Sequence, residues 1–95
     1  MVIDFHIHSK YSFDCFLEPS RVIDIARLAG LDGLAIADHD TMAGVAEFKK
    51  LAPDLYIIPA QEITTRQGDI LGLFLKDQIE KRDDLQWNLR AIRLQ

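Results

Sequence analysis

The sequence predicts an α/β fold in which β/α units build a parallel sheet. Short apolar runs typical of strands alternate with segments of helical spacing, and turn residues bound each run. The chain has 95 residues, which is enough for one small domain. A complete eight-unit β/α barrel needs about 200 residues or more, so that architecture is excluded. We therefore expect residues 1–95 to form a single domain with about three β/α units.

The first strand and helix are predicted by alternation and by residues typical of helix boundaries. Val2 to His8 alternates strictly, with apolar side chains on one face and polar ones, both histidines among them, on the other. Residues 9–18 are expected to form a loop. A helix should then run from about Pro19 to Ala29, because proline suits the first helical position and Gly30 suits the position past the end.

The second strand and helix follow from an apolar run and a capping residue. Gly33 to Asp38 is apolar almost throughout, which is typical of a buried strand in a parallel sheet. Asp40 or Thr41 can cap the helix that we expect from about Met42 to Leu51.

Two more strands are expected in the next part of the chain. Leu55 to Ile58 predicts a third strand that Pro59 stops, with residues 62–65 continuing in extended form. Ile70 to Leu75 is a fourth strand-like run, which follows a turn. Strand, helix, strand, helix, strand is the order expected of parallel β/α units.

The C-terminal segment, residues 76–95, is expected to be a charged loop followed by a helix. The helix should run from about Asp83 to Leu94, with leucine and isoleucine side chains on one side. Phe74 and Trp87 are interpreted as core residues rather than as stacking surfaces.

Composition and charge exclude several classes of protein. The 11 Lys and Arg against 15 Asp and Glu give a net charge of −4, which argues against bulk binding of nucleic-acid backbone. The single cysteine excludes an internal disulfide framework and fits a reducing compartment. No apolar stretch approaches the roughly 20 residues of a membrane span, and no signal peptide is recognisable. We therefore expect a cytoplasmic protein without a membrane partner.

All three histidines lie where the predicted strands end. His6 and His8 end the first strand, and His39 directly follows the second. Residues i and i+2 of a strand point to the same side, so the first two imidazoles can reach one divalent ion. Because the carboxyl ends of parallel strands meet at one edge of the sheet, the three histidines predict a metal site at that edge.

Several carboxylates accompany these histidines, and each also has a plainer interpretation as a solvated residue. Glu62 follows the third strand and can bridge two cations, and Asp14 lies within reach of a metal held by His39. Asp4 is either a solvated strand residue or the acceptor for a histidine ring N–H. Asp69 is either a turn residue or a further ligand.

Four motifs, in order, resemble the N-terminal part of the polymerase and histidinol phosphatase (PHP) superfamily. They are the segments 4–9 (DFHIHS), 34–41 (LAIADHDT), 59–63 (PAQEI) and 68–73 (GDILGL). The resemblance covers about residues 1–75 and rests on the order of the motifs as well as on each one.

The resemblance implies a distorted seven-stranded β/α barrel, of which this chain is a truncated part, with two or three divalent ions of zinc, manganese or iron. The implied ligands of one ion are His6 and His8, and Glu62 is implied to bridge that ion to a second. Asp14 and His39 match ligands of a third ion. The implied reaction is hydrolysis of a phosphate ester by metal-activated water.

Asp38 and Asp69 occupy motif positions of the family, whereas residues 76–95 lack its later motifs. Asp38 matches a motif residue with a supporting role, and with Glu62 and His39 it completes the expected catalytic set. Asp69 stands where the phosphoesterase branch usually has histidine, and as a carboxylate it is still expected to bind a hard cation. The later family motifs, a histidine after a further strand and an Asp-x-His, have no counterpart in residues 76–95.

Two functions stay open from the sequence. The first is a metal-dependent phosphoesterase of PHP type that acts on a nucleotide or a small phosphomonoester. The alternative is a truncated PHP fragment that binds metal, or self-associates as a homo-oligomer through open strand edges, without catalytic turnover.

Overall fold

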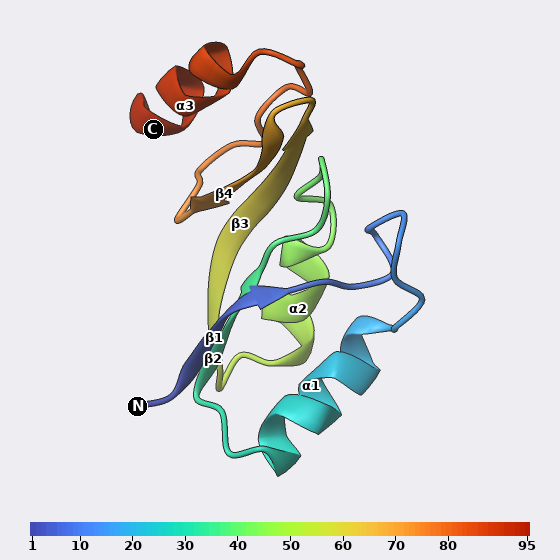
Figure 1. The fold of residues 1–95 in the computed structure, drawn as a ribbon. Coiled ribbons are helices and arrows are strands. Elements are labelled where there is room, and N and C mark those ends of the chain that lie inside the picture. The colour runs from blue at the N-terminus through green and yellow to red at the C-terminus, as the bar shows by residue number, and fades with distance from the viewer.

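Four strands form one curled sheet in the computed structural model, which describes residues 1–95 (Figure 1). They lie side by side in chain order and are β1 (Ile3–Ile7), β2 (Gly33–Ile36), β3 (Tyr56–Thr65) and β4 (Gly68–Leu73). The first three are parallel, whereas β4 runs antiparallel to β3. Two residues join β3 to β4, which is too short for a parallel crossover. The predicted α/β class with a partial barrel is confirmed, with this antiparallel fourth strand added.

Two helices, α1 (Pro19–Leu28) and α2 (Val45–Leu51), cover one face of the sheet (Figure 1). Side chains alternate along β2, so Leu34 and Ile36 point toward the helices while Ala35 points away. The larger core lies between helices and sheet and consists of Val22, Ile23, Ala26, Leu34, Ile36, Val45, Phe48 and Ala52. A smaller cluster on the other face consists of Ala35, Ala37, Ile58 and Ala60.

The start and end of α1 agree with the sequence prediction. Pro19 is its first residue, and Gly30 follows its end with a φ of +75°. That left-handed conformation turns the chain so that the Leu31 N–H donates to the Ala26 carbonyl at 3.0 Å. The helix therefore ends where only glycine is at ease in the backbone.

The predicted cap of α2 is wrong. This helix begins at Val45 rather than Met42, and its N-terminal boundary residue, Gly44, makes no capping hydrogen bond with a side chain. Asp40 instead adopts a φ of 57°, and its Oδ1 accepts a hydrogen bond from the Thr64 N–H at 3.0 Å. The aspartate therefore ties the segment after β2 to β3, a contact across the sheet that local sequence does not reveal.

Pro59 does not stop the third strand, contrary to the prediction. β3 runs through it without interruption, pairing with β2 up to the Ile36–Pro59 position and with β4 from Ala60 onward. The missing N–H of the proline falls where one partner strand ends and the other begins. Its carbonyl still accepts a hydrogen bond from the Leu75 N–H at 3.0 Å.

The third helix, α3 (Leu85–Arg93), packs against β4 at the other end of the molecule (Figure 1). The side chain of Asp84 caps it by accepting a hydrogen bond from the Trp87 N–H at 3.0 Å. Phe74 is 66% exposed and has a φ of 57°, so its predicted place in the core is wrong. Trp87 is half-buried under the Arg82 guanidinium, 4.0 Å from its ring centroid. None of the three helices has the length and apolarity needed to cross a membrane.

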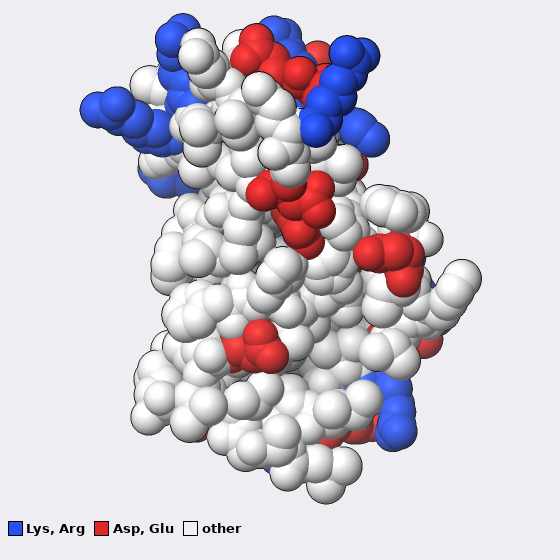
Figure 2. Space-filling view, viewed as in Figure 1, with Lys and Arg blue, Asp and Glu red and all other residues white.

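Basic side chains gather at the end of the molecule that carries α3, with acidic ones among them (Figure 2). Three of these basic residues form ion pairs: Arg66 with Asp83, Lys81 with Asp40, and Arg82 with Glu80. Their charge is thus partly balanced within the chain.

Candidate metal centre

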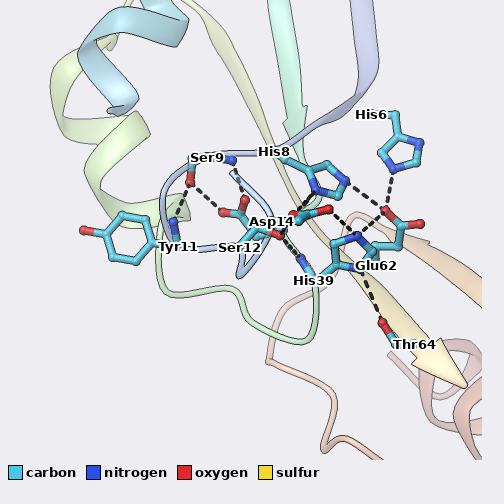
Figure 3. Close-up of polar contacts among 10 residues, drawn as sticks. His6, His8, Ser9, Tyr11, Ser12, Asp14, His39, Glu62 and Thr64 are labelled. Atoms are coloured by element: carbon cyan, nitrogen blue, oxygen red, sulfur yellow. Dashed lines mark hydrogen bonds and ion pairs between the residues drawn. The ribbon is translucent and has the colours of Figure 1, made fainter. Parts of the chain in front are cut away.

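The three histidines and Glu62 meet at the carboxyl ends of β1, β2 and β3 (Figure 3). His6 lies in β1 and His8 directly after it, while His39 lies shortly after β2. A parallel bridge joins His39 to Glu62: the Glu62 N–H donates to the Asp38 carbonyl at 3.1 Å, and the Asp40 N–H donates to the Glu62 carbonyl at 2.8 Å. The backbone of the sheet itself therefore sets the positions of these residues.

A first group of metal-binding side chains is His6, His8 and Glu62. One carboxylate oxygen, Glu62 Oε1, lies 2.7 Å from His6 Nε2 and 2.9 Å from His8 Nε2. The Glu62 side chain is almost buried, and both imidazoles point at it from β1 (Figure 3). The i and i+2 spacing thus places both rings on one side, as the sequence predicts.

Two further groups share members with the first. His39 Nε2 lies 3.2 Å from Asp14 Oδ2, and His8 Nδ1 lies 3.5 Å from Asp14 Oδ1. Asp69 of β4 joins His39 and Glu62 in the third group. All six residues predicted as metal ligands therefore come together: His6, His8, Asp14, His39, Glu62 and Asp69.

The spacing of the donor atoms fits a divalent cation. Bonds of about 2.0–2.1 Å in tetrahedral geometry place two ligand atoms of one zinc ion about 3.3 Å apart. The distances here lie on both sides of that value, from 2.7 Å for His6 and Glu62 to 3.7 Å for His39 and Glu62. Imidazole nitrogens and carboxylate oxygens are both ligands of divalent metal ions in proteins.

A buried serine, Ser12, holds the loop donors in place. Its Oγ donates to Asp14 Oδ1 at 2.8 Å and accepts from the backbone N–H of His39 at 2.9 Å. The same Oγ lies 3.3 Å from the ring nitrogen Nδ1 of His8. On the other side of His39, Thr64 Oγ1 lies 3.3 Å from Nδ1, which leaves Nε2 facing Asp14 and Glu62. Such contacts fix the orientation of an imidazole that binds a metal through its other nitrogen.

Charge and hydrogen bonding keep two carboxylates of the cluster, Glu62 and Asp14, ionised. Burial alone would raise the pKa of Glu62, but the hydrogen bond to His6 and the charges of the three histidines lower it overall. The hydrogen bond from Ser12 lowers the pKa of Asp14, helped by the charge of His39. Both carboxylates are therefore in the anionic form that binds cations.

Asp38 lies apart from the donor groups and contacts the first loop instead. Its Oδ1 accepts from the Ser9 N–H at 2.5 Å and its Oδ2 from the Ser9 hydroxyl at 2.8 Å, with all of these groups buried. A Cβ at Gly44 would lie 3.2 Å from Asp38 Oδ2 and 2.8 Å from the Tyr11 ring. Asp38 therefore supports the first loop from beside the cluster, and its membership of the catalytic set stays a prediction.

Asp4 also differs from one of its two interpretations. Its Oδ1 accepts from the backbone N–H of His6 at 3.0 Å and does not contact a histidine ring. Together with His6 and Leu17 it lines a mostly apolar hollow of about 320 Å³ between β1 and α1.

The sequence interpretation missed the hydroxyl groups that support the site. Ser9, Ser12 and Thr64 have no periodic pattern, and each is an ordinary loop or strand-end residue by itself. One signal was available: Ser9 directly follows the second histidine of the first motif, and Ser12 lies two residues before Asp14.

Comparison with known proteins agrees with this arrangement. The model of the PHP domain matches residues 4–82. A Haemophilus influenzae protein named 5'-3' exoribonuclease is 34% identical over 95% of this chain and 35% of its own length. An uncharacterized Methanocaldococcus jannaschii protein is 37% identical over 85% of this chain and 54% of its own length.

Two solved structures are also similar. An amidohydrolase from Chromobacterium violaceum superposes with a TM-score of 0.72 at 29% identity, covering 99% of this chain and 33% of that one. A proposed metal-dependent phosphoesterase from Bifidobacterium adolescentis gives a TM-score of 0.61 at 32% identity, covering 75% of this chain and 26% of that one. The chain thus spans about half the length of the first relative and about a third or less of the others.

Proposed function

The chain belongs to the PHP domain family, and from this premise we propose that it carries the metal-binding half of a phosphoesterase that hydrolyses a phosphate ester. One observation carries the proposal: three groups of donor side chains overlap, so that His8, His39 and Glu62 each belong to two of them. Overlap of this kind fits two or three neighbouring cations, because the groups lie side by side and a carboxylate such as Glu62 can bind two adjacent ions.

In this proposal the six clustered residues hold the cations. Zinc, manganese or iron, when bound, supplies Lewis acidity that lowers the pKa of water and balances charge on phosphoryl oxygens. Glu62 and His39 are the proposed catalytic residues, because every donor group contains at least one of them. Asp38 is a positioning residue that acts through Ser9 on the first loop.

The proposed substrate is a nucleotide or a small phosphomonoester. The names of two relatives, a 5'-3' exoribonuclease and a proposed metal-dependent phosphoesterase, support hydrolysis of phosphate esters. The proposed domain comprises residues 1–95, of which the family model matches residues 4–82.

The proposal is tested by metal analysis and hydrolysis together. We expect the purified protein to bind manganese or zinc and, so loaded, to hydrolyse 4-nitrophenyl phosphate. The double variant His6→Ala with His39→Ala should lose both metal and activity. Asp24→Ala, an exposed carboxylate of α1 outside every donor group, is the matched control and should lose neither. Activity that survives the double substitution would overturn the assignment.

A second candidate function is metal binding with self-association and no turnover. It is favoured by the free edge of β1, which has no partner strand on its outer side and exposes Phe5. Bound metal without hydrolysis of any phosphate ester, in a protein that elutes as a dimer in size-exclusion chromatography, would favour this candidate.

A further inference from the structure

An aromatic ring stands in the open directly beside the donor cluster. The ring centroid of Phe13 lies 5.0 Å from that of His39, with 44° between the ring planes, and the residue is 76% exposed. One face of the His39 environment is therefore bordered by a phenyl ring that contacts solvent. The proposed function does not use this ring.

The position of Phe13 is set by its two neighbours in the chain. Ser12 is buried and bonded to His39, and the Asp14 carboxylate lies against His39 and His8. Because the residues on both sides belong to the cluster, the backbone between them cannot move away while these contacts persist. The ring therefore stays near the cluster in spite of its exposure.

A second phenylalanine of the same loop, Phe16, is exposed but has no such neighbour. Phe16 is 93% exposed, and its ring contacts neither an aromatic ring nor a histidine. An exposed ring of this kind is common on protein surfaces. Phe13 differs because it is exposed and also held next to the cluster at which the phosphoryl group of a substrate would bind.

We propose that Phe13 is a stacking surface that selects phosphate esters bearing a planar aromatic group close to the phosphorus. This inference rests on the proposed function. With the phosphoryl group at the cluster, the aromatic group of such an ester lies against the free face of Phe13. Rings stack with centroids about 4.5–7 Å apart, so a ring stacked on Phe13 has its centroid no more than about 12 Å from that of His39. Esters of aliphatic alcohols gain nothing from this contact.

The test measures binding rather than turnover. Zinc-loaded protein is titrated by calorimetry with phenylphosphonate and with methylphosphonate, two analogues that are not hydrolysed. We expect Phe13→Ala to weaken phenylphosphonate binding about tenfold and to leave methylphosphonate binding unchanged. Phe13→Tyr, which keeps a ring, should bind phenylphosphonate as tightly as the wild type does. Phe16→Ala should change neither affinity.

Other outcomes separate the inference from the function on which it rests. If the wild-type protein binds both phosphonates and Phe13→Ala leaves their affinity ratio unchanged, the inference is wrong and the phosphoryl site stands. Equal weakening of both ligands also overturns it, because it would mean that Phe13 only shields or orients His39. If the wild-type protein binds neither phosphonate, the proposed function fails and the inference fails with it.

Discussion

The strand-borne and the loop-borne donors of the cluster reach the same place by different physical means. His6 and Glu62 lie within β1 and β3, where the register of the sheet fixes their positions. Asp14 lies in the loop between β1 and α1 and depends on the side-chain hydrogen bond from Ser12. The sheet therefore supplies half of the site through its backbone, whereas the loop half needs a polar network of its own.

Loss of the core beneath the sheet should remove both halves of the site and have the largest effect. Phe48 is fully buried between α2 and β2, and Phe48→Ala is expected to cost about 3–5 kcal/mol of the free energy of unfolding. That is a large part of the roughly 5–15 kcal/mol typical of a small domain. Urea unfolding measures the loss, with the exposed Leu28→Ala as a control near zero.

Removal of Asp38, the buried acceptor that holds the first loop through Ser9, should affect the loop-borne donors and spare the strand-borne ones. Asp38→Ala leaves the Ser9 N–H and hydroxyl without an acceptor for their hydrogen bonds, at a cost of about 1–3 kcal/mol. We expect trypsin to cut faster after Lys10, in the same loop, while His6, His8 and Glu62 still bind a cation. Asp38→Asn keeps one acceptor oxygen, and its rate of cleavage should lie between those of the wild type and Asp38→Ala. Loss of all metal from Asp38→Ala would contradict the division into two halves.

A smaller effect is expected from crowding the same contact. The Cβ added in Gly44→Ala would meet the Tyr11 ring at 2.8 Å and the Ser9 hydroxyl at 3.3 Å. The ring can swing aside, so we expect a loss of about 1 kcal/mol, at the lower end for overpacking. Gly44 has a φ of −79°, so the backbone adds no strain, and the loss is crowding less the gain from a stiffer unfolded chain. A free energy of unfolding equal to that of the wild type would mean that the loop is not held against α2.

The smallest expected effect is a change in the pH dependence of stability, caused by loss of the hydrogen bond to Asp14 in Ser12→Ala. The hydrogen bond from Ser12 is the largest cause that lowers the pKa of Asp14, so its removal should raise that pKa toward the ordinary value. A carboxyl with a lowered folded pKa stabilises the protein above its unfolded pKa, and this contribution is lost as pH falls through the folded pKa. Ser12→Ala should therefore lose less stability on acidification.

Titration followed by NMR provides the measurement and its internal control. The pKa of Asp54 is lowered by the hydrogen bond from Arg27, in the last turn of α1. This pKa should be the same in Ser12→Ala and the wild type. An Asp14 titration that does not change would show that the histidines alone hold this carboxylate.

The parts of the site that follow a regular pattern could be predicted from the sequence. Alternation in the first strand places His6 and His8 on one side, and the apolar run of the second strand places His39 at its end. Ser12 and Thr64 could not be predicted in this way, because their roles depend on contacts between segments far apart in the chain.

The same distinction applies to the fold. The boundaries of α1 follow from Pro19 and Gly30, which act locally. Pro59 misleads because its effect depends on which strand lies beside it, and β3 changes partner at that residue. Asp40 looks like a helix cap in the sequence, but its hydrogen bond to Thr64 crosses between strands.

The change of partner along β3 also bears on how the site assembles during folding. The hairpin of β3 and β4 with α3 is built from contacts close in sequence, which form quickly, whereas the pairing of β1, β2 and β3 must close long crossovers. We therefore expect His6 and His8 to become ordered with the slower unit and Glu62, beyond Pro59, with the faster one. Cooperative units of this kind open separately in amide hydrogen exchange. A cation held between them would join the two units, so that they exchange as one.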